Sequence, residues 1–241
     1  MQTGLYVAIS SQISLERRMN TIADNLANMN TVGFRATQLK FDDVVTRADG
    51  TKVNYVSTGR EYLSPDNGAL VQTKNPFDFA VRGDVWFSIA SPQGDAITRD
   101  GRFSMLATGD LVTLEGYPVL DAGGAPIQLN ANEGPPTVSA DGVLYQNGRP
   151  VAALGLFEAN VGPDFVRVGN TAIIPAEQPQ PVVNRMDAGV KQGFVEQSNV
   201  NPIKQMTQMI TVSRTFEYVT QLMRDGETSL SEAIKTLGGS R

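Results

Sequence analysis

The stretch LYVAISSQISLERRMNTIADNLANM, residues 5–29, places apolar side chains at alternating steps of three and four residues. This 3.5-residue spacing predicts an amphipathic helix with one apolar seam. Of the seam positions, only Gln12 is polar. The seam comprises Leu5, Ala8, Gln12, Leu15, Met19, Ile22, Leu26 and Met29. The opposite face is predicted to be solvent-exposed and carries Ser10, Ser14, Arg17, Asn20 and Asp24.

A second helix is predicted at the other end of the chain. Asn201 suits an N-cap, and Pro202 suits the first helical turn, where its missing N–H costs nothing. The turn-like dipeptide Asp225-Gly226 is the weak point of this helix and leaves its continuity there open, and Gly238-Gly239 predicts the helix end. The seam of this helix again alternates by three and four: Met209, Val212, Phe216, Val219, Met223, Gly226, Leu230, Ala233 and Leu237.

Between these helices the chain is rich in turn residues, with most of its 23 glycines and 13 prolines. Short alternating runs separated by Gly, Asp and Asn predict antiparallel strands. These runs are Val85–Ile89, Asp95–Arg99, Arg102–Met105, Leu111–Leu114, Val143–Tyr145 and Val151–Phe157.

The predicted fold class is therefore α+β, with N- and C-terminal helices paired as a coiled-coil-like bundle and a central antiparallel all-β domain. Four segments are expected along the chain. They are an N-terminal helix (1–34), a linker with an extended arm or hairpin around Asp49-Gly50 (35–75), the central β domain (76–197) and a C-terminal helix (198–241).

Composition limits the chemistry of this 241-residue chain. It has no Cys and no His, which removes Cys/His zinc sites, thiol nucleophiles and histidine bases. With 20 basic and 25 acidic residues, its net charge of −5 argues against nucleic acid as a partner. No apolar run is long enough to span a membrane, and no cleavable signal peptide is expected at the N-terminus.

The strongest enzymatic interpretation uses carboxylates as a glycosidase acid and base, or as calcium ligands. Most of them stand beside glycine in predicted turns, where Asp serves local backbone bonding. Trp86 and Phe87 suit a core better than a sugar platform. We therefore expect no enzyme, no cofactor, no metal and no small-molecule substrate. The carboxylates concerned are Asp42, Asp43, Asp84, Asp95, Asp100 and Asp110.

The apolar seams exceed what one helix pair can cover, since each helix of a lone pair keeps one flank exposed. Neighbouring copies can cover it, and a head-to-tail contact between different surfaces propagates into a ring or an open helix. Packing of both helices on the chain's own β domain is the alternative, and spacing does not decide between the two. The expected interface residues are Leu5, Leu15, Met19, Ile22, Leu26, Met209, Val212, Phe216, Val219, Met223 and Leu230.

Three segments, in order, carry a resemblance to a known family. Residues 22–35 end a helix with Thr31-Val-Gly33-Phe34-Arg35, residues 83–119 hold a central β signature, and residues 193–202 precede the last helix. Together they resemble the bacterial flagellar rod and hook family. The motif residues are Asn25, Asn28, Thr31, Gly33, Phe34, Ser198, Asn201 and Pro202.

The resemblance implies a structural subunit of the basal-body rod, a hollow helical drive shaft that crosses the periplasm, transmits torque for motility and passes exported subunits. Its partners would be copies of itself, other rod proteins and the flagellar type III export apparatus, with no signal cleavage. Length and the opening Thr3-Gly-Leu-Tyr-Val are most similar to proximal rod members. A distal rod protein is one alternative, and a non-enzymatic β-domain binding module is another.

Overall fold

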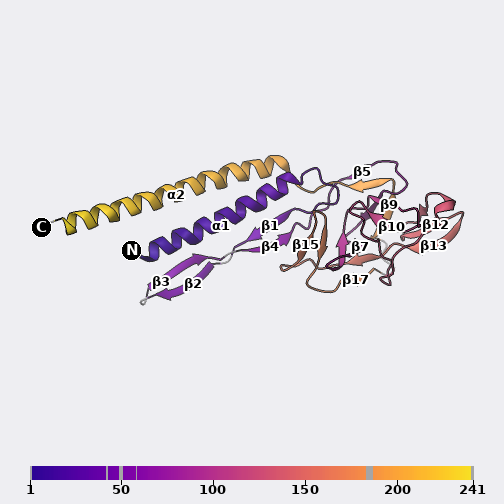
Figure 1. Cartoon of the computed structure of the whole chain (residues 1–241), viewed down its shortest axis with the longest axis horizontal. Coiled ribbons are helices and arrows are strands. Elements are labelled where there is room, and N and C mark those ends of the chain that lie inside the picture. The colour runs from indigo at the N-terminus through magenta and orange to yellow at the C-terminus, as the bar shows by residue number, and fades with distance from the viewer. Residues whose placement is uncertain (1, 42, 49–50, 58, 183–186, 240–241) are drawn as a thin grey trace. The chain divides into compact units, whose positions relative to one another are not determined.

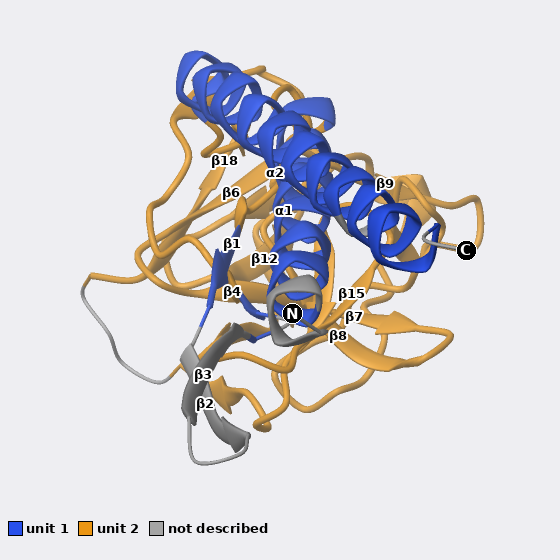
Figure 2. Cartoon of the chain, turned by 90° about the vertical axis from the view of Figure 1, so that its left-hand side faces the viewer, with its two compact units in different colours: residues 1–27, 38–61, 201–241 blue, residues 28–37, 62–200 orange. Residues whose placement is uncertain are grey.

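The structure is a computed structural model that describes residues 2–41, 43–48, 51–57, 59–182 and 187–239. The chain divides into two compact units, coloured separately in Figure 2. Unit 1 contains residues 1–27, 38–61 and 201–241, and unit 2 contains residues 28–37 and 62–200.

Unit 1 contains the two helices that the apolar repeats predict, α1 (Gln2–Ala27) and α2 (Pro202–Gly238). Asn201 caps α2, because its side-chain oxygen accepts from the Lys204 N–H at 3.1 Å, and Pro202 follows at the first turn. At the other end, the N–H of Gly239 donates to the Lys235 carbonyl. Both predicted ends of this helix are confirmed.

The sequence leaves open whether the last helix continues through Asp225-Gly226, and the structure shows that it does, because α2 is one continuous helix of 37 residues. Gly226 has no neighbouring atom within 4 Å of an ideal Cβ, so nothing pushes the backbone aside there. A glycine inside a helix costs only about 1 kcal/mol relative to alanine. The turns on either side outweigh that cost.

The two helices of unit 1 run side by side and antiparallel, so the chain's two ends lie at the same end of the pair (Figure 1). Their register is marked by Gln12, whose Nε2 donates to Thr220 Oγ1 over 3.3 Å. Because α1 has 26 residues and α2 has 37, the last turns of α2 have no α1 residue opposite them.

Next to α1 lies a hairpin made of β2 (Asp43–Ala48) and β3 (Thr51–Val56). It occupies the span in which the sequence places an arm or hairpin, and its two turn residues, 49 and 50, lie outside the described residues. The chain leads into and out of the hairpin through β1 (Thr37–Lys40) and β4 (Arg60–Leu63), which pair with each other.

Unit 2 is built on a six-stranded sheet in the order β15-β16-β8-β7-β14-β17. Every strand pair whose register is known is antiparallel. The strands of this sheet are β7 (Trp86–Ser91), β8 (Gly94–Thr98), β14 (Leu156–Glu158), β15 (Val166–Val168), β16 (Ala172–Ile174) and β17 (Gln180–Pro181).

Smaller sheets complete unit 2. A three-stranded sheet joins β11, β12 and β13, and two-stranded sheets join β9 with β10, β6 with β18 and β5 with β19. One 3-10 turn, Ala131–Glu133, interrupts the strands. The strands are β5 (Leu70–Gln72), β6 (Phe79–Arg82), β9 (Phe103–Met105), β10 (Leu111–Thr113), β11 (Thr137–Val138), β12 (Val143–Gln146), β13 (Arg149–Ala153), β18 (Gly189–Gln192) and β19 (Phe194–Glu196).

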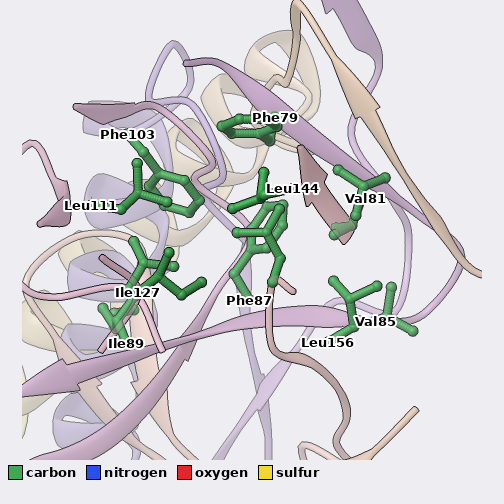
Figure 3. Close-up of a cluster of buried hydrophobic side chains, with 14 of the residues drawn as sticks. Phe79, Val81, Val85, Phe87, Ile89, Phe103, Leu111, Ile127, Leu144 and Leu156 are labelled. Atoms are coloured by element: carbon green, nitrogen blue, oxygen red, sulfur yellow. The ribbon is translucent and has the colours of Figure 1, made fainter. Parts of the chain in front are cut away.

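One apolar cluster holds these sheets together (Figure 3). At its centre the rings of Phe87 and Phe103 meet edge to face, with their centroids 5.2 Å apart. Trp86 and Phe87 are both buried, as a core role requires. The cluster draws on β6, β7, β10, β12 and β14 through Phe79, Val81, Phe87, Ile89, Leu111, Leu144 and Leu156.

The prediction of one strand over Val151–Phe157 is wrong. The run is divided between β13, in the three-stranded sheet, and β14, in the six-stranded sheet. The division falls at Gly155, whose N–H donates to the Leu120 carbonyl while its own carbonyl accepts from Ser88. A Cβ at this position would lie 2.6 Å from the Asp121 carbonyl oxygen, so only glycine allows this close approach.

The fold class therefore agrees with the sequence in its broad terms. Helices stand at both ends of the chain, and antiparallel sheets lie between them. Among the described residues, no helix is both long enough and apolar enough to span a bilayer.

Candidate assembly site

The expected interface residues follow one side of each helix, and two of them are buried within the single copy. Ile22 is 4% exposed and Val212 is 3% exposed. The remaining seam side chains are half-buried, so the partner helix covers them only in part. They are Leu15, Met19 and Leu26 on α1, and Met209, Phe216, Val219 and Met223 on α2. The side chains of Leu5 and Leu230 lie outside the described residues.

Ser14 corrects the predicted solvent-exposed face of α1. It is only 7% exposed, and its hydroxyl lies 2.9 Å from the Ser10 carbonyl and 3.3 Å from the Ser57 carbonyl. The segment that leaves the hairpin therefore covers this position. Arg17, Asn20 and Asp24 are exposed as expected. Helical periodicity could not reveal this second covering segment, because it comes from a distant part of the chain.

Each helix also carries a short apolar stripe on the side away from its seam, a placement that follows from about 3.6 residues per turn. The α1 outer stripe consists of Tyr6, Ile9 and Ile13, which are 59%, 38% and 46% exposed. The α2 outer stripe, at the start of that helix, consists of Ile203, Met206 and Ile210, which are also exposed. Three large apolar side chains in adjacent turns form a contiguous apolar patch, a feature typical of interaction surfaces.

The motif residues before and after the helices converge in unit 2. Gly33 has φ +72°, and its N–H donates to the Glu196 carbonyl at 2.7 Å. A Cβ on Gly33 would lie 2.3 Å from the Asp100 nitrogen. Phe34 is 2% exposed and packs with Ala36 and Val200. The Thr31-x-Gly-Phe motif therefore fits against the segment that precedes α2, and glycine is required there by both φ and space.

Hydrogen bonds of Asn28, Thr31, Ser198 and Asn199 complete this convergence. Asn199 Oδ1 accepts from the Ala36 N–H at 2.8 Å, and its Nδ2 donates to the Asp66 carbonyl at 2.7 Å. Thr31 Oγ1 donates to Asn28 Oδ1 at 3.1 Å, and the hydroxyl of Ser198 accepts from the Val200 N–H at 3.3 Å. Asn25, the last motif residue on α1, is 2% exposed. Ser198 and Asn199 thus bond backbone groups, and Thr31 bonds the neighbouring side chain of Asn28.

A buried ionic cluster lies at the centre of the convergence and comprises Arg35, Arg99 and Glu196. Arg99 Nε donates to Glu196 Oε2 at 2.7 Å, and both side chains are almost fully buried, at 1% and 2% exposed. The second carboxylate oxygen, Oε1, accepts from the Gly68 N–H at 2.9 Å and lies 3.6 Å from Arg35 Nη2. One carboxylate therefore serves two guanidinium groups.

The guanidinium of Arg35 closes the loop that follows β4. Its Nη1 donates to the carbonyls of Ser64, Pro65 and Asp66. Burial, together with the nearby charge of Arg99, lowers the pKa of Arg35 to about 10. Even so, this pKa keeps Arg35 protonated at neutral pH, so the cluster carries a net positive charge.

Trp86 lies against both arginines of the cluster. The guanidinium carbons of Arg35 and Arg99 lie 5.4 and 5.6 Å from the centroid of its ring. Cations over the face of an indole are stabilised by its quadrupole. Trp86 therefore packs against two buried guanidinium cations. The single carboxylate of Glu196 neutralises their charge only in part.

The carboxylates considered for catalysis or calcium are dispersed. Asp84 and Asp95 are exposed, Asp100 is buried and pairs with Arg102 at 2.6 Å, and Asp110 accepts from Thr108. Asp42 lies outside the described residues, as does the side chain of Asp43. Within the described part of the chain, no group of three or more Asp or Glu residues is placed to hold a metal ion.

Sequence reasoning assigned no role to Arg35, Arg99 or Glu196, although each stands in one of the three segments that carry the family resemblance. Arg35 ends the first, Arg99 lies in the second and Glu196 lies in the third. The sequence signal for this cluster was that each of the three motifs contains a charged residue. Their pairing could not be read from one sequence.

Three family models match the chain in the same order as these segments. Residues 5–35 match the model of the flagella basal body rod protein. Residues 80–146 match the D1 domain of the flagellar hook protein FlgE/F/G, and residues 191–236 match the C-terminal part of the flagellar basal body rod FlgEFG protein. With the full-length relatives described next, these matches show that the chain belongs to the flagellar basal-body rod protein family.

Within that family the chain is similar over its full length to proteins called FlgF. It is 59% identical to the flagellar basal-body rod protein FlgF of Rhizobium meliloti (strain 1021), over all of both chains. It is 56% identical to FlgF of Mesorhizobium japonicum, over 99% of each. The flagellar basal-body rod protein FlgG of Bacillus subtilis is 26% identical, over 97% of this chain and 98% of the relative.

Proposed function

We propose that this protein is a structural subunit of the flagellar basal-body rod and that its role is mechanical rather than catalytic. The full-length similarity to FlgF proteins is the observation that carries this proposal. Two FlgF relatives are 59% and 56% identical to this chain, against 26% for FlgG of Bacillus subtilis, which favours the proximal over the distal rod. Copies of this chain and other rod proteins are its partners, and the flagellar export apparatus delivers it without signal cleavage.

The terminal helices supply the assembly module. We infer that residues 1–34 and 198–241 form a coiled-coil-like bundle, extended by neighbouring subunits into a tube. The half-buried seam supports this inference, since Leu15, Met19 and Phe216 remain partly exposed in a single copy. Burying a large apolar side chain contributes roughly 1.5–3 kcal/mol, so several such side chains supply a substantial driving force for assembly.

The β domain, residues 76–197, sets spacing and stiffness on the outer side of the tube, and residues 35–75 link it to the helices. The buried cluster around Glu196 supports a stiff β domain, because its ion pairs and hydrogen bonds hold three distant segments of the chain together. A hollow shaft of this kind transmits torque and leaves a channel through which exported chains pass.

The test replaces the chromosomal gene with variants of the helix seam. Leu15→Asp or Ile22→Asp should abolish rod assembly and motility, because a carboxylate then faces an apolar contact. Fluorescence of Trp86, which lies in unit 2, should stay at its wild-type wavelength and so report an intact β domain. Normal motility in either variant, with the variant protein present in basal bodies, would refute assembly through the seam.

A further inference from the structure

A hollow of about 820 Å³ lies on the six-stranded sheet of unit 2, and Trp86 forms part of its wall. Phe87 belongs to the large apolar cluster, so Trp86, its neighbour on β7, points to the opposite face of the sheet. Every residue that lines the hollow belongs to unit 2. We call this hollow the Trp86 pocket.

The Trp86 pocket has a buried hydrogen-bond donor in its lining. Arg35 is 5% exposed, and its two terminal nitrogens donate to the loop that follows β4. Its Nε is also buried, but within the described residues it has no hydrogen-bond partner. Because a buried donor without an acceptor is costly, an acceptor group brought into the pocket gains a strong hydrogen bond at Arg35.

The exposed part of the lining is acidic. Asp84, Glu158 and Glu177 contribute carboxylates there, whereas Arg35 is the one cation of the described lining. The ion pair of Arg99 with Glu196 behind Arg35 adds no net charge to this balance. The pocket therefore favours an occupant that carries a positive charge near the surface and an acceptor near Arg35.

Side-chain amides complete the exposed lining. They come from Asn160, Gln178 and Gln180. Each amide offers both a donor and an acceptor, which matches the alternating N–H and C=O groups of a peptide backbone. Gln180 lies on the edge strand β17 next to Pro181, which has no N–H to donate. A bound peptide is therefore held by side chains and is not added to the sheet as a strand.

A second hollow, of about 540 Å³, adjoins the Trp86 pocket, and Gln178 lines both. Its lining includes Ser88, which lies two residues after Trp86 on β7 and so on the same face of the sheet. Phe157 and Pro179 give it an apolar wall. A compact molecule fills one hollow, whereas an extended chain of six residues, about 20 Å long, reaches both.

We propose that the Trp86 pocket and the adjoining hollow bind an extended peptide segment of another protein, one that contains a lysine or arginine. A backbone carbonyl of the segment accepts from Arg35 Nε, and its basic side chain lies among the three carboxylates. An apolar side chain occupies the adjoining hollow. The site lies wholly in unit 2, so it does not depend on the proposed assembly through the helices.

The fluorescence of Trp86 reports binding directly, because it is the one tryptophan of the chain and lines the pocket. The full-length protein is titrated with three pools of hexapeptides, acetylated and amidated so that their ends carry no charge. The third residue is Lys, Gln or Glu, and the other positions are random among uncharged residues without Trp or Tyr. The Lys pool should change the emission of Trp86 saturably and bind at least about tenfold more tightly than the Glu pool, with the Gln pool between them.

Charge reversal at the pocket separates this site from general attraction of basic peptides to an acidic protein. Glu177→Lys places a cation in the exposed lining and should weaken binding of the Lys pool at least about tenfold. Glu115→Lys is the matched control, since it makes the same change of net charge at an exposed residue outside both hollows. It should leave that binding within about twofold of the wild type.

Three results would overturn the proposal. The first is no saturable change of Trp86 emission with the Lys pool, and the second is an equal loss of binding in Glu177→Lys and Glu115→Lys. The third is the same response to free lysine at the same concentration, which would assign the pocket to a small amine. None of these results bears on rod assembly, so the proposed function stands or falls separately.

Discussion

Arg99 and Glu196 stand 97 positions apart in the chain, yet Arg99 Nε lies 2.7 Å from Glu196 Oε2 in an almost fully buried ion pair. Three segments meet at this pair: the chain after α1, the strand β8 region and the chain before α2. Within unit 2, Glu196 therefore holds the segment that follows α1 and the segment after β8 against the segment that precedes α2. The stability of unit 2 is therefore expected to depend on Glu196.

Glu196→Gln should destabilise the protein by about 3–5 kcal/mol, because it leaves two buried guanidinium groups without a carboxylate. Urea unfolding followed by the fluorescence of Trp86 measures the loss. Glu177→Gln, an exposed change of the same chemistry, should alter stability by less than about 0.5 kcal/mol. Equal effects of the two substitutions would contradict the role given to Glu196.

Gly33→Ala combines two penalties at one residue. The left-handed φ of +72° costs a non-glycine residue roughly 1–2 kcal/mol, and the new methyl group would also collide with the Asp100 backbone. Gly116→Ala is the control, since it has φ +85° and no atom within 4 Å of its Cβ. Thermal unfolding should show a clearly larger loss for Gly33→Ala. A loss no larger than that of Gly116→Ala would mean that the Asp100 backbone moves away easily.

Ser14→Asp should not be tolerated, although helical periodicity assigns this position to solvent. The serine is buried against the Ser57 carbonyl, so a carboxylate there meets a backbone acceptor instead of water. Asn20→Asp introduces the same charge at an exposed position of α1 and should have little effect. Motility assays and helical content by circular dichroism of both variants check this expectation. Full motility of Ser14→Asp would show that Ser57 does not cover α1 in the assembled protein.

Gly226→Ala should stabilise α2 by up to about 1 kcal/mol, because alanine restricts the unfolded chain and meets nothing in the folded one. The amplitude of the helical circular dichroism signal and the melting temperature should both rise. A fall in either would point to a close contact or a bend at Gly226.

The sequence predicts the ends of α2 well because capping is local. Asn201 and Pro202 act on neighbouring backbone, and no distant residue is needed to place them. The hairpins of the β unit are also marked locally by turn residues. The division of Val151–Phe157 at Gly155 is not, because it depends on the close approach of residues 120–121.

The candidate site shows the same limit. Spacing identifies which side of α1 faces α2, and Ile22 and Val212 are indeed buried. It cannot reveal that Ser57 covers Ser14, or that Arg35 and Arg99 share one carboxylate. Such pairings depend on long-range topology, whereas periodicity records only the neighbours within a helix.

A single copy leaves apolar helix surface exposed, and we expect other subunits to cover it. Electron cryomicroscopy of basal bodies isolated from cells that carry this protein tests it most directly, through the surroundings of Ile9 and Ile13 in each subunit. We expect both side chains to be buried against helices of neighbouring subunits. Subunits in the rod whose Ile9 and Ile13 still face solvent, with contacts made only between β domains, would contradict it.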